Sequence, residues 1–109
     1  MSIADAHKAV DFIINNAKPY AQAKANRIYC EEFRKSKKAL LMASSDEQTA
    51  VAREQYAYSH PEYVAILQGL REAVEVEEQL RWQMVAAQAR IEVLRSEEAT
   101  ARSEVRATQ

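Results

Sequence analysis

A seven-residue repeat of apolar side chains runs through the second half of the chain, from Tyr63 to Val105. Its two core positions hold Tyr63, Leu70, Glu77, Met84, Ile91, Glu98 and Val105, and Ile66, Ala73, Leu80, Ala87, Leu94 and Ala101. Glutamates are the only violations. Alternating steps of three and four residues place these side chains along one side of an α-helix, and a helix of this kind needs a partner helix.

Few residues in the 109-residue chain favour turns, since it contains one glycine and two prolines. Good helix formers fill most of the rest, which predicts an all-α fold. Ser59, Pro61 and Glu62 have the spacing of a helix start, and no proline follows, so we expect a second arm over 60–106. Gly69 within this arm costs about 1 kcal/mol relative to alanine unless it allows another backbone to approach closely.

A first helical arm is expected over residues 3–43. Ser2 and Asp5 have the spacing of a helix start. Small or apolar residues then recur at mostly three- and four-residue steps, which predicts a core-facing stripe of Ile3, Ala6, Val10, Ile13, Ala17, Ala21, Ala25, Ile28, Phe33, Ser36 and Leu40. Pro19 interrupts this pattern and predicts a kink.

The connection over 44–59 is expected to hold a short helix at 46–57, because Ser45 and Gln48 have capping-box spacing. Residues 18–42 carry seven basic and two acidic side chains, whereas 61–85 carry two basic and five acidic ones. An antiparallel hairpin makes the arms nearly equal and brings Lys24 and Arg27 beside residues 75–79. The sequence therefore predicts one helical domain over 1–109, a hairpin of two long helices.

A second apolar stripe on the second arm predicts self-association. Trp82, Ala86, Ala89 and Val93 follow steps of four, three and four, and so lie on another side of the helix than the seven-residue repeat. A hairpin partner buries only one of these sides. We therefore expect a homodimer in which two hairpins form a four-helix bundle or a coiled-coil assembly around these four residues.

The residues that usually carry catalysis are scarce and scattered in this sequence. His7 and His60 are expected far apart on the surface, and the acidic neighbours of Cys30 disfavour a reactive thiolate. No glycine-rich loop is present to bind phosphate, and no Glu-x-x-His pair to bind metal. We expect neither enzymatic activity nor a cofactor. No apolar run reaches the roughly 18 residues needed to cross a membrane, so we expect a soluble protein. The single Cys30 and the lack of a signal-peptide apolar segment lead us to expect the cytoplasm.

A cluster of cations on the first arm is the best candidate for a nucleic-acid contact. It comprises Arg34, Lys35, Lys37 and Lys38, with the aromatic residues Tyr29 and Phe33 beside it. Clustered cations bind phosphates, and aromatic rings stack on bases. Glu31 interrupts the stripe, however, so a solvated face partly neutralised by the other arm is the competing interpretation, and an acidic protein partner is a third.

The segments EEFRKSKKALLM and HPEYVAILQGLREAVEVEEQLRWQMVAAQARIEVLRSEEATARSE resemble small helical proteins of tailed bacteriophages and prophages. This resemblance implies a bacterial host cell and an accessory role in DNA recombination or replication. The leading hypothesis is a non-enzymatic adaptor that binds itself, a phage or host protein, and single-stranded DNA. The alternatives are an inhibitor of a host protein, whose acidic 72–78 face mimics nucleic acid, and a structural component of the virion.

Overall fold

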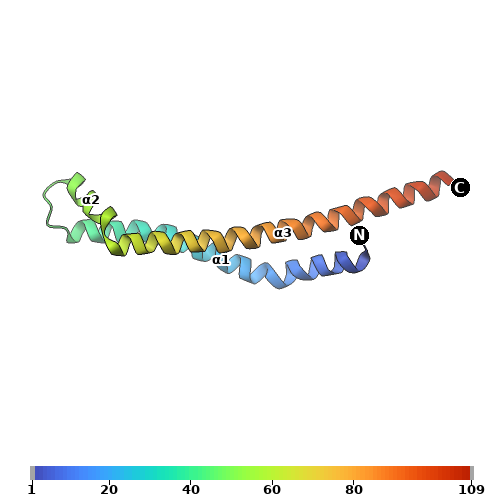
Figure 1. The fold of residues 1–109 in the computed structure, drawn as a ribbon, viewed down its shortest axis with the longest axis horizontal. Helices are drawn as coiled ribbons and strands as arrows, with labels where there is room; N and C mark the ends of the chain where they lie inside the picture. Colours follow the sequence, from blue (N-terminus) through green and yellow to red (C-terminus); the bar gives the residue numbers. More distant parts are fainter. Residues whose placement is uncertain (1, 109) are drawn as a thin grey trace. The chain divides into compact units, whose positions relative to one another are not determined.

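The computed structural model describes residues 2–108, which form three α-helices and contain no strand. α1 spans Ile3–Ser44, α2 spans Ala50–Ser59 and α3 spans Pro61–Thr108 (Figure 1). The predicted all-α class is confirmed. The expected arms over 3–43 and 60–106 differ from α1 and α3 by at most two residues at any end. Met1 and Gln109, the ends of the expected domain, lie outside the described residues.

α1 begins with a capping box formed by Ser2 and Asp5. The backbone N–H of Asp5 donates to Ser2 Oγ at 3.2 Å, and the backbone N–H of Ser2 donates to Asp5 Oδ2 at 3.1 Å. These bonds satisfy donors that have no partner within the helix, and the hydrogen bonds from Ser2 lower the pKa of Asp5. α1 then continues through Pro19 as one helix. The kink expected at Pro19 stays a prediction.

The short helix in the connection starts later than expected. α2 begins at Ala50 because Thr49, in an extended conformation, is its N-cap and accepts the backbone N–H of Ala52 at 3.1 Å. Ser45, the expected cap, accepts the backbone N–H of Glu47 in a local turn instead. The prediction of a helix over 46–57 is therefore wrong at its start, by four residues, and the observed helix ends two residues later than predicted.

The start of α3 also uses a different cap from the expected one. Ser59 is the last residue of α2, and its hydroxyl donates to the carbonyl of Gln55 at 2.8 Å. One residue, His60, separates the two helices, and its Nδ1 accepts the backbone N–H of Glu62 at 3.1 Å. Pro61 stands in the first turn, where its missing N–H leaves no bond unmade, as the sequence predicts.

Two compact units divide the chain, and each contains a segment of both long helices. The first consists of Met1–Tyr20 and Gln79–Gln109, and it places Lys8 and Phe12 of α1 beside Gln83 and Arg90 of α3. The second is Ala21–Glu78 and includes α2. Here α1 and α3 run antiparallel, since Arg27 contacts Glu77 whereas Lys37, further along α1, contacts Glu62, earlier in α3.

The seven-residue repeat of α3 forms its side toward α1. Every repeat position from Tyr63 to Leu94 is buried or half-buried, whereas Glu98, Ala101 and Val105 are exposed. Both glutamate violations thus have an explanation. Glu98 lies where the repeat is open to solvent, and Glu77 meets an arginine of α1.

The side of α1 that contacts α3 is not the predicted one. Of the expected stripe, only Ala6 and Ile13 are half-buried, and its other members are exposed. The buried or half-buried register is Ala6, Ala9, Ile13, Asn16, Tyr20, Ala23, Arg27, Cys30, Arg34, Lys37 and Leu41. Long basic side chains fit there because their aliphatic stems cover apolar surface while their charged ends reach carboxylates or water. The more apolar side of α1 consequently faces outward.

An ion pair joins the two helices inside the second unit. The Arg27 guanidinium bonds Glu77 through two nitrogens, with Nη2 3.0 Å from Oε1, and also bonds Glu31 at 3.2 Å. The side chain of Glu77 is only 8% exposed and that of Arg27 is 25% exposed. The hydrogen bond with Glu77 raises the pKa of Arg27, so the guanidinium stays charged. This is the contact expected between Arg27 and residues 75–79, and it fixes the register of the two helices.

The described residues contain a thin core. Leu41, Ala57 and Tyr63 form a small cluster where α2 joins the long helices, with Met42 packed against it. The other buried apolar residues are all alanines, Ala9, Ala73 and Ala87. Every valine in the described chain is exposed. None of the three helices contains a stretch with the length and apolarity required to cross a bilayer.

Candidate functional site

The predicted oligomer interface lies on the solvent side of α3. Trp82, Ala86, Ala89 and Val93 are all exposed, with 59% of Trp82 and 47% of Val93 accessible. Their spacing turns them away from the buried repeat of the same helix. The guanidinium carbon of Arg81 lies 4.5 Å from the centre of the Trp82 ring. The four residues form an apolar strip on α3, here called the Trp82 face. α1 does not cover most of this strip.

A hollow of about 390 Å³ adjoins the Trp82 face in the first unit. Phe12 of α1 and Ala86 and Ala87 of α3 give it an apolar lining, while Lys8, Gln83 and Arg90 complete its wall. Ala86 belongs to both the hollow and the Trp82 face. Side chains of one helix enter gaps of this kind when helices pack together, so the hollow extends the surface available to a partner helix.

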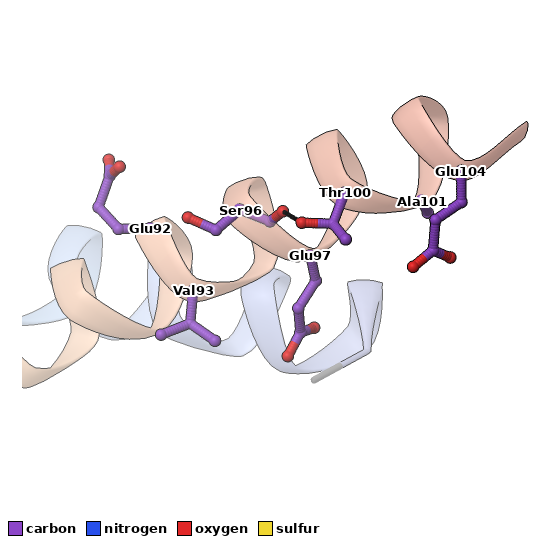
Figure 2. A pocket seen from close by; sticks show the side chains of 7 residues that line it. All are labelled: Glu92, Val93, Ser96, Glu97, Thr100, Ala101 and Glu104. Carbon is purple, nitrogen blue, oxygen red and sulfur yellow. Dashed lines mark hydrogen bonds between the residues drawn. The ribbon is translucent and has the colours of Figure 1, made fainter. Parts of the chain in front are cut away.

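Another hollow, of about 510 Å³, is lined by residues of α3 (Figure 2). Its lining includes Val93 and three carboxylates, from Glu92, Glu97 and Glu104. Figure 2 shows that the carboxylates of Glu92 and Glu97 point to opposite sides of the helix. The Thr100 hydroxyl donates to the carbonyl of Ser96 at 3.0 Å, a bond within the helix. The carboxylates of Glu92 and Glu97 therefore do not converge on one point.

Intramolecular contacts already engage three cations of the predicted nucleic-acid site. Lys35 Nζ lies 3.3 Å from Glu32 Oε1, Lys37 Nζ lies 2.7 Å from Glu62 Oε2, and Lys38 Nζ lies 2.9 Å from Glu54 Oε1. Arg34 is half-buried in the side of α1 toward α3. Arg34, Lys35, Lys37 and Lys38 thus lie together as predicted, but much of their charge is balanced locally.

Tyr58 adds to the environment of Lys38. The ammonium lies 4.6 Å from the centre of the Tyr58 ring, and a hydrogen bond to Tyr58, followed by the bond to Glu54, raises the pKa of Lys38. The same lysine lowers the pKa of Glu54, and Lys37 lowers the pKa of Glu62. These contacts tie α1 to α2 and to the start of α3, which is a structural role for two of the four cations.

The aromatic residues beside the cluster stack on each other. The rings of Tyr29 and Phe33 are nearly parallel, at 6°, with centres 5.8 Å apart. Tyr29 is among the most exposed large side chains of the described chain. One turn of helix separates the two residues, so their stacking follows from helical spacing. The exposed ring is the part of this region that offers a surface for a base or for an apolar side chain.

His60 has a structural role at the start of α3, whereas His7 and Cys30 are placed separately on α1. His60 caps α3 through Nδ1, and its ring packs edge-on against Tyr56 with centres 5.6 Å apart. His7 is exposed on α1. Cys30 is half-buried, with its sulfur 4.0 Å from Asn26 Oδ1. Within residues 2–108, no three histidine, cysteine or acidic side chains are grouped as a metal site would require.

The sequence interpretation identified an apolar stripe on α1 but missed that this stripe lies on the outward side of the helix. Ile3, Val10 and Ile14 are exposed there, although the first two were assigned to the core. The missing signal was a second seven-residue register in α1, which begins Ala6, Ala9, Ile13, Asn16, Tyr20 and includes polar residues. A search for apolar residues alone does not detect this register, because polar residues interrupt it.

Comparison with models of protein families, with curated proteins and with solved structures found no match to this chain.

Proposed function

We propose that the protein is a non-enzymatic helical adaptor that acts by binding other proteins, including a second copy of itself, through apolar helix surfaces. The observation that carries this proposal is the distribution of apolar side chains. Alanines fill much of the contact between α1 and α3, whereas Trp82 and every described valine are exposed. Contiguous exposed apolar surface marks interaction sites, and Trp82, Ala86, Ala89 and Val93 form such a strip on α3.

The Trp82 face is the proposed site of dimerisation. Small residues at Ala86 and Ala89 allow a second helix to approach closely, and Trp82 supplies a large apolar anchor. Replacing Trp82 with arginine should therefore reduce the mass of the assembly, as measured by light scattering after size-exclusion chromatography. Gln88→Arg is the matched control, because it adds the same charge at an exposed α3 position outside the face. Equal masses for Trp82→Arg and the unmutated protein would contradict this assignment.

The resemblance to phage and prophage proteins supports a cellular context for the adaptor. In that context it is an accessory factor in DNA recombination or replication within a bacterial host cell. The test is affinity purification of the tagged protein from infected or lysogenic cells. The proposal is supported if the unmutated protein recovers a recombination or replication protein. That recovery should be lost with Trp82→Arg or with a variant of another exposed apolar surface. Recovery of virion proteins instead would favour a structural component of the particle.

Contact with single-stranded DNA is a second candidate function, supported by the exposed Tyr29 ring beside Arg34 and Lys35. The bonds of Lys37 to Glu62 and of Lys38 to Glu54 weaken the case. Replacing Arg34, Lys35, Lys37 and Lys38 with glutamine should lower DNA affinity and flatten its salt dependence, measured by fluorescence anisotropy. Absence of binding by the unmutated protein at low salt would eliminate this candidate.

Inhibition of a host protein by the acidic 72–78 face is the remaining alternative. Glu72 and Glu75 are exposed, as nucleic-acid mimicry requires, but Glu77 is directed into the ion pair with Arg27. Replacing Glu72 and Glu75 with glutamine should then abolish capture of a host protein that itself binds nucleic acid. Retention of such a host protein by this variant would rule out mimicry as the mode of binding.

A further inference from the structure

The outward side of α1 in the first unit carries a continuous apolar stripe. Ile3 is 62% exposed, Val10 is 40% exposed and Ile14 is 66% exposed, and Ala17 continues the line. The buried register of α1 in this unit uses Ala6, Ala9, Ile13, Asn16 and Tyr20, so the stripe lies on the exposed flank of the helix, about a quarter turn from that register. These four residues are here called the α1 stripe.

The accessible area of the chain leaves room for more than one interface. The surface measures 7967 Å², whereas a folded monomer of 12.4 kDa typically exposes about 6,100 Å². The excess is about 1,800 Å², and an interface of standard size covers about 800 Å² of each partner. A dimer built on the Trp82 face alone would leave about half of this excess exposed to water.

Charged residues at the edge of the α1 stripe indicate which partner helix fits the stripe and in which direction that helix runs. Asp11 and Lys18 are both exposed and lie seven residues apart, on the same side of α1 and nearly symmetric about Ile14. If two copies of α1 pack antiparallel about a twofold axis at the level between Ile14 and Asn15, the two copies of Ile14 lie next to each other across the axis. Asp11 then lies opposite Lys18 of the second copy, and the same ion pair forms twice. A parallel arrangement would instead place like charges together.

From this complementarity we infer that the α1 stripe is a twofold, antiparallel docking face for a second copy of the chain, separate from the Trp82 face. The stripe belongs to α1 and the Trp82 face to α3, so one chain presents two self-association surfaces. With both surfaces occupied, the assembly contains more than two copies, and the simplest closed arrangement is a tetramer with dihedral symmetry.

Charge reversal tests the predicted orientation. Asp11→Lys and Lys18→Asp each replace two attractive pairs by two repulsive ones, and each should weaken association through this face by about tenfold. The double variant Asp11→Lys/Lys18→Asp restores both pairs in reversed order and should return the dissociation constant to near the unmutated value, as measured by analytical ultracentrifugation. A double variant no better than the single variants would overturn the proposal.

Cross-linking tests the position of the twofold axis without depending on affinity. In a Cys30→Ser background, Ile14→Cys places a thiol near the axis, and mild oxidation should yield a disulfide-linked dimer on denaturing gels. Asn15→Cys is the matched control, because Asn15 is also exposed but lies off the stripe. Equal cross-linking of the two variants, or none with Ile14→Cys, would overturn the proposal.

The Ile14 substitutions also separate this inference from the proposed dimerisation at Trp82. Ile14→Glu should reduce the assembly to the pair held by the Trp82 face, while Asn15→Glu leaves its mass unchanged. Trp82→Arg removes the other surface. If Ile14→Glu has no effect while Trp82→Arg reduces the mass, the α1 stripe is refuted and the Trp82 face stands. The opposite result refutes the Trp82 face alone.

Discussion

Replacing Gly69 with alanine should stabilise the protein. Gly69 lies inside α3, its φ angle is not positive, and a Cβ atom built on it meets nothing within 4 Å. Alanine therefore gains helix propensity without steric strain, and the free energy of unfolding should rise by about 1 kcal/mol. For a domain of this size, that gain corresponds to an increase in Tm of about 4–8 °C.

Thermal unfolding followed by circular dichroism, at one fixed protein concentration, measures this effect. Ala65→Gly is the matched control, because Ala65 is exposed in the same helix one turn earlier. It should lower Tm by a similar amount. If Gly69→Ala lowers Tm while Ala65→Gly behaves as expected, another chain occupies the space above Gly69 in the assembled protein. The assignment of open surface at this position would then be refuted.

Three further substitutions or conditions test the contacts within the second unit. Leu41→Ala should lower the free energy of unfolding by about 3 kcal/mol in urea titrations, whereas the exposed neighbour Leu40→Ala should change it by less than about 0.5 kcal/mol. Arg27→Gln removes the guanidinium from nearly buried Glu77 and should destabilise more than Arg27→Gln/Glu77→Gln; simple additivity of the single effects would contradict the pairing. Lys38 lowers the pKa of Glu54 and Lys37 that of Glu62, so their contribution is present above the ordinary pKa of 4.5 and is lost as pH falls through the lowered values. As pH is lowered, the urea midpoint of unfolding should therefore fall less steeply for Glu54→Gln/Glu62→Gln than for the unmutated chain.

The sequence predicts α3 better than α1, for a physical reason. The seven-residue repeat of α3 is mostly apolar, so its periodicity identifies the side that contacts α1. In α1 that side includes Arg27, Arg34 and Lys37, whose charged ends reach water or carboxylates while their aliphatic stems pack. It also includes Asn16, whose amide donates to the carbonyl of Phe12. Apolar periodicity alone therefore selects the outward side, and the register that contacts α3 is missed.

The long-range charge pattern predicts the pairing of the arms, but not the local caps. Segregation of basic and acidic residues brings Arg27 to Glu77, as the structure shows. Thr49 and His60, by contrast, act as caps because of the backbone geometry of a short connection. Several polar residues in that connection, including Ser45 and Ser59, have equally suitable side chains, so spacing alone does not identify the cap.

The central claim is that the outward apolar surfaces of this chain are covered by further copies of it. Light scattering coupled to size-exclusion chromatography, on the unmutated protein at micromolar concentration, tests this claim most directly. The expected result is a folded species of at least twice the 12.4 kDa mass of one chain, with a mass near four chains if both surfaces are occupied. A well-folded monomer of 12.4 kDa at that concentration would contradict the claim.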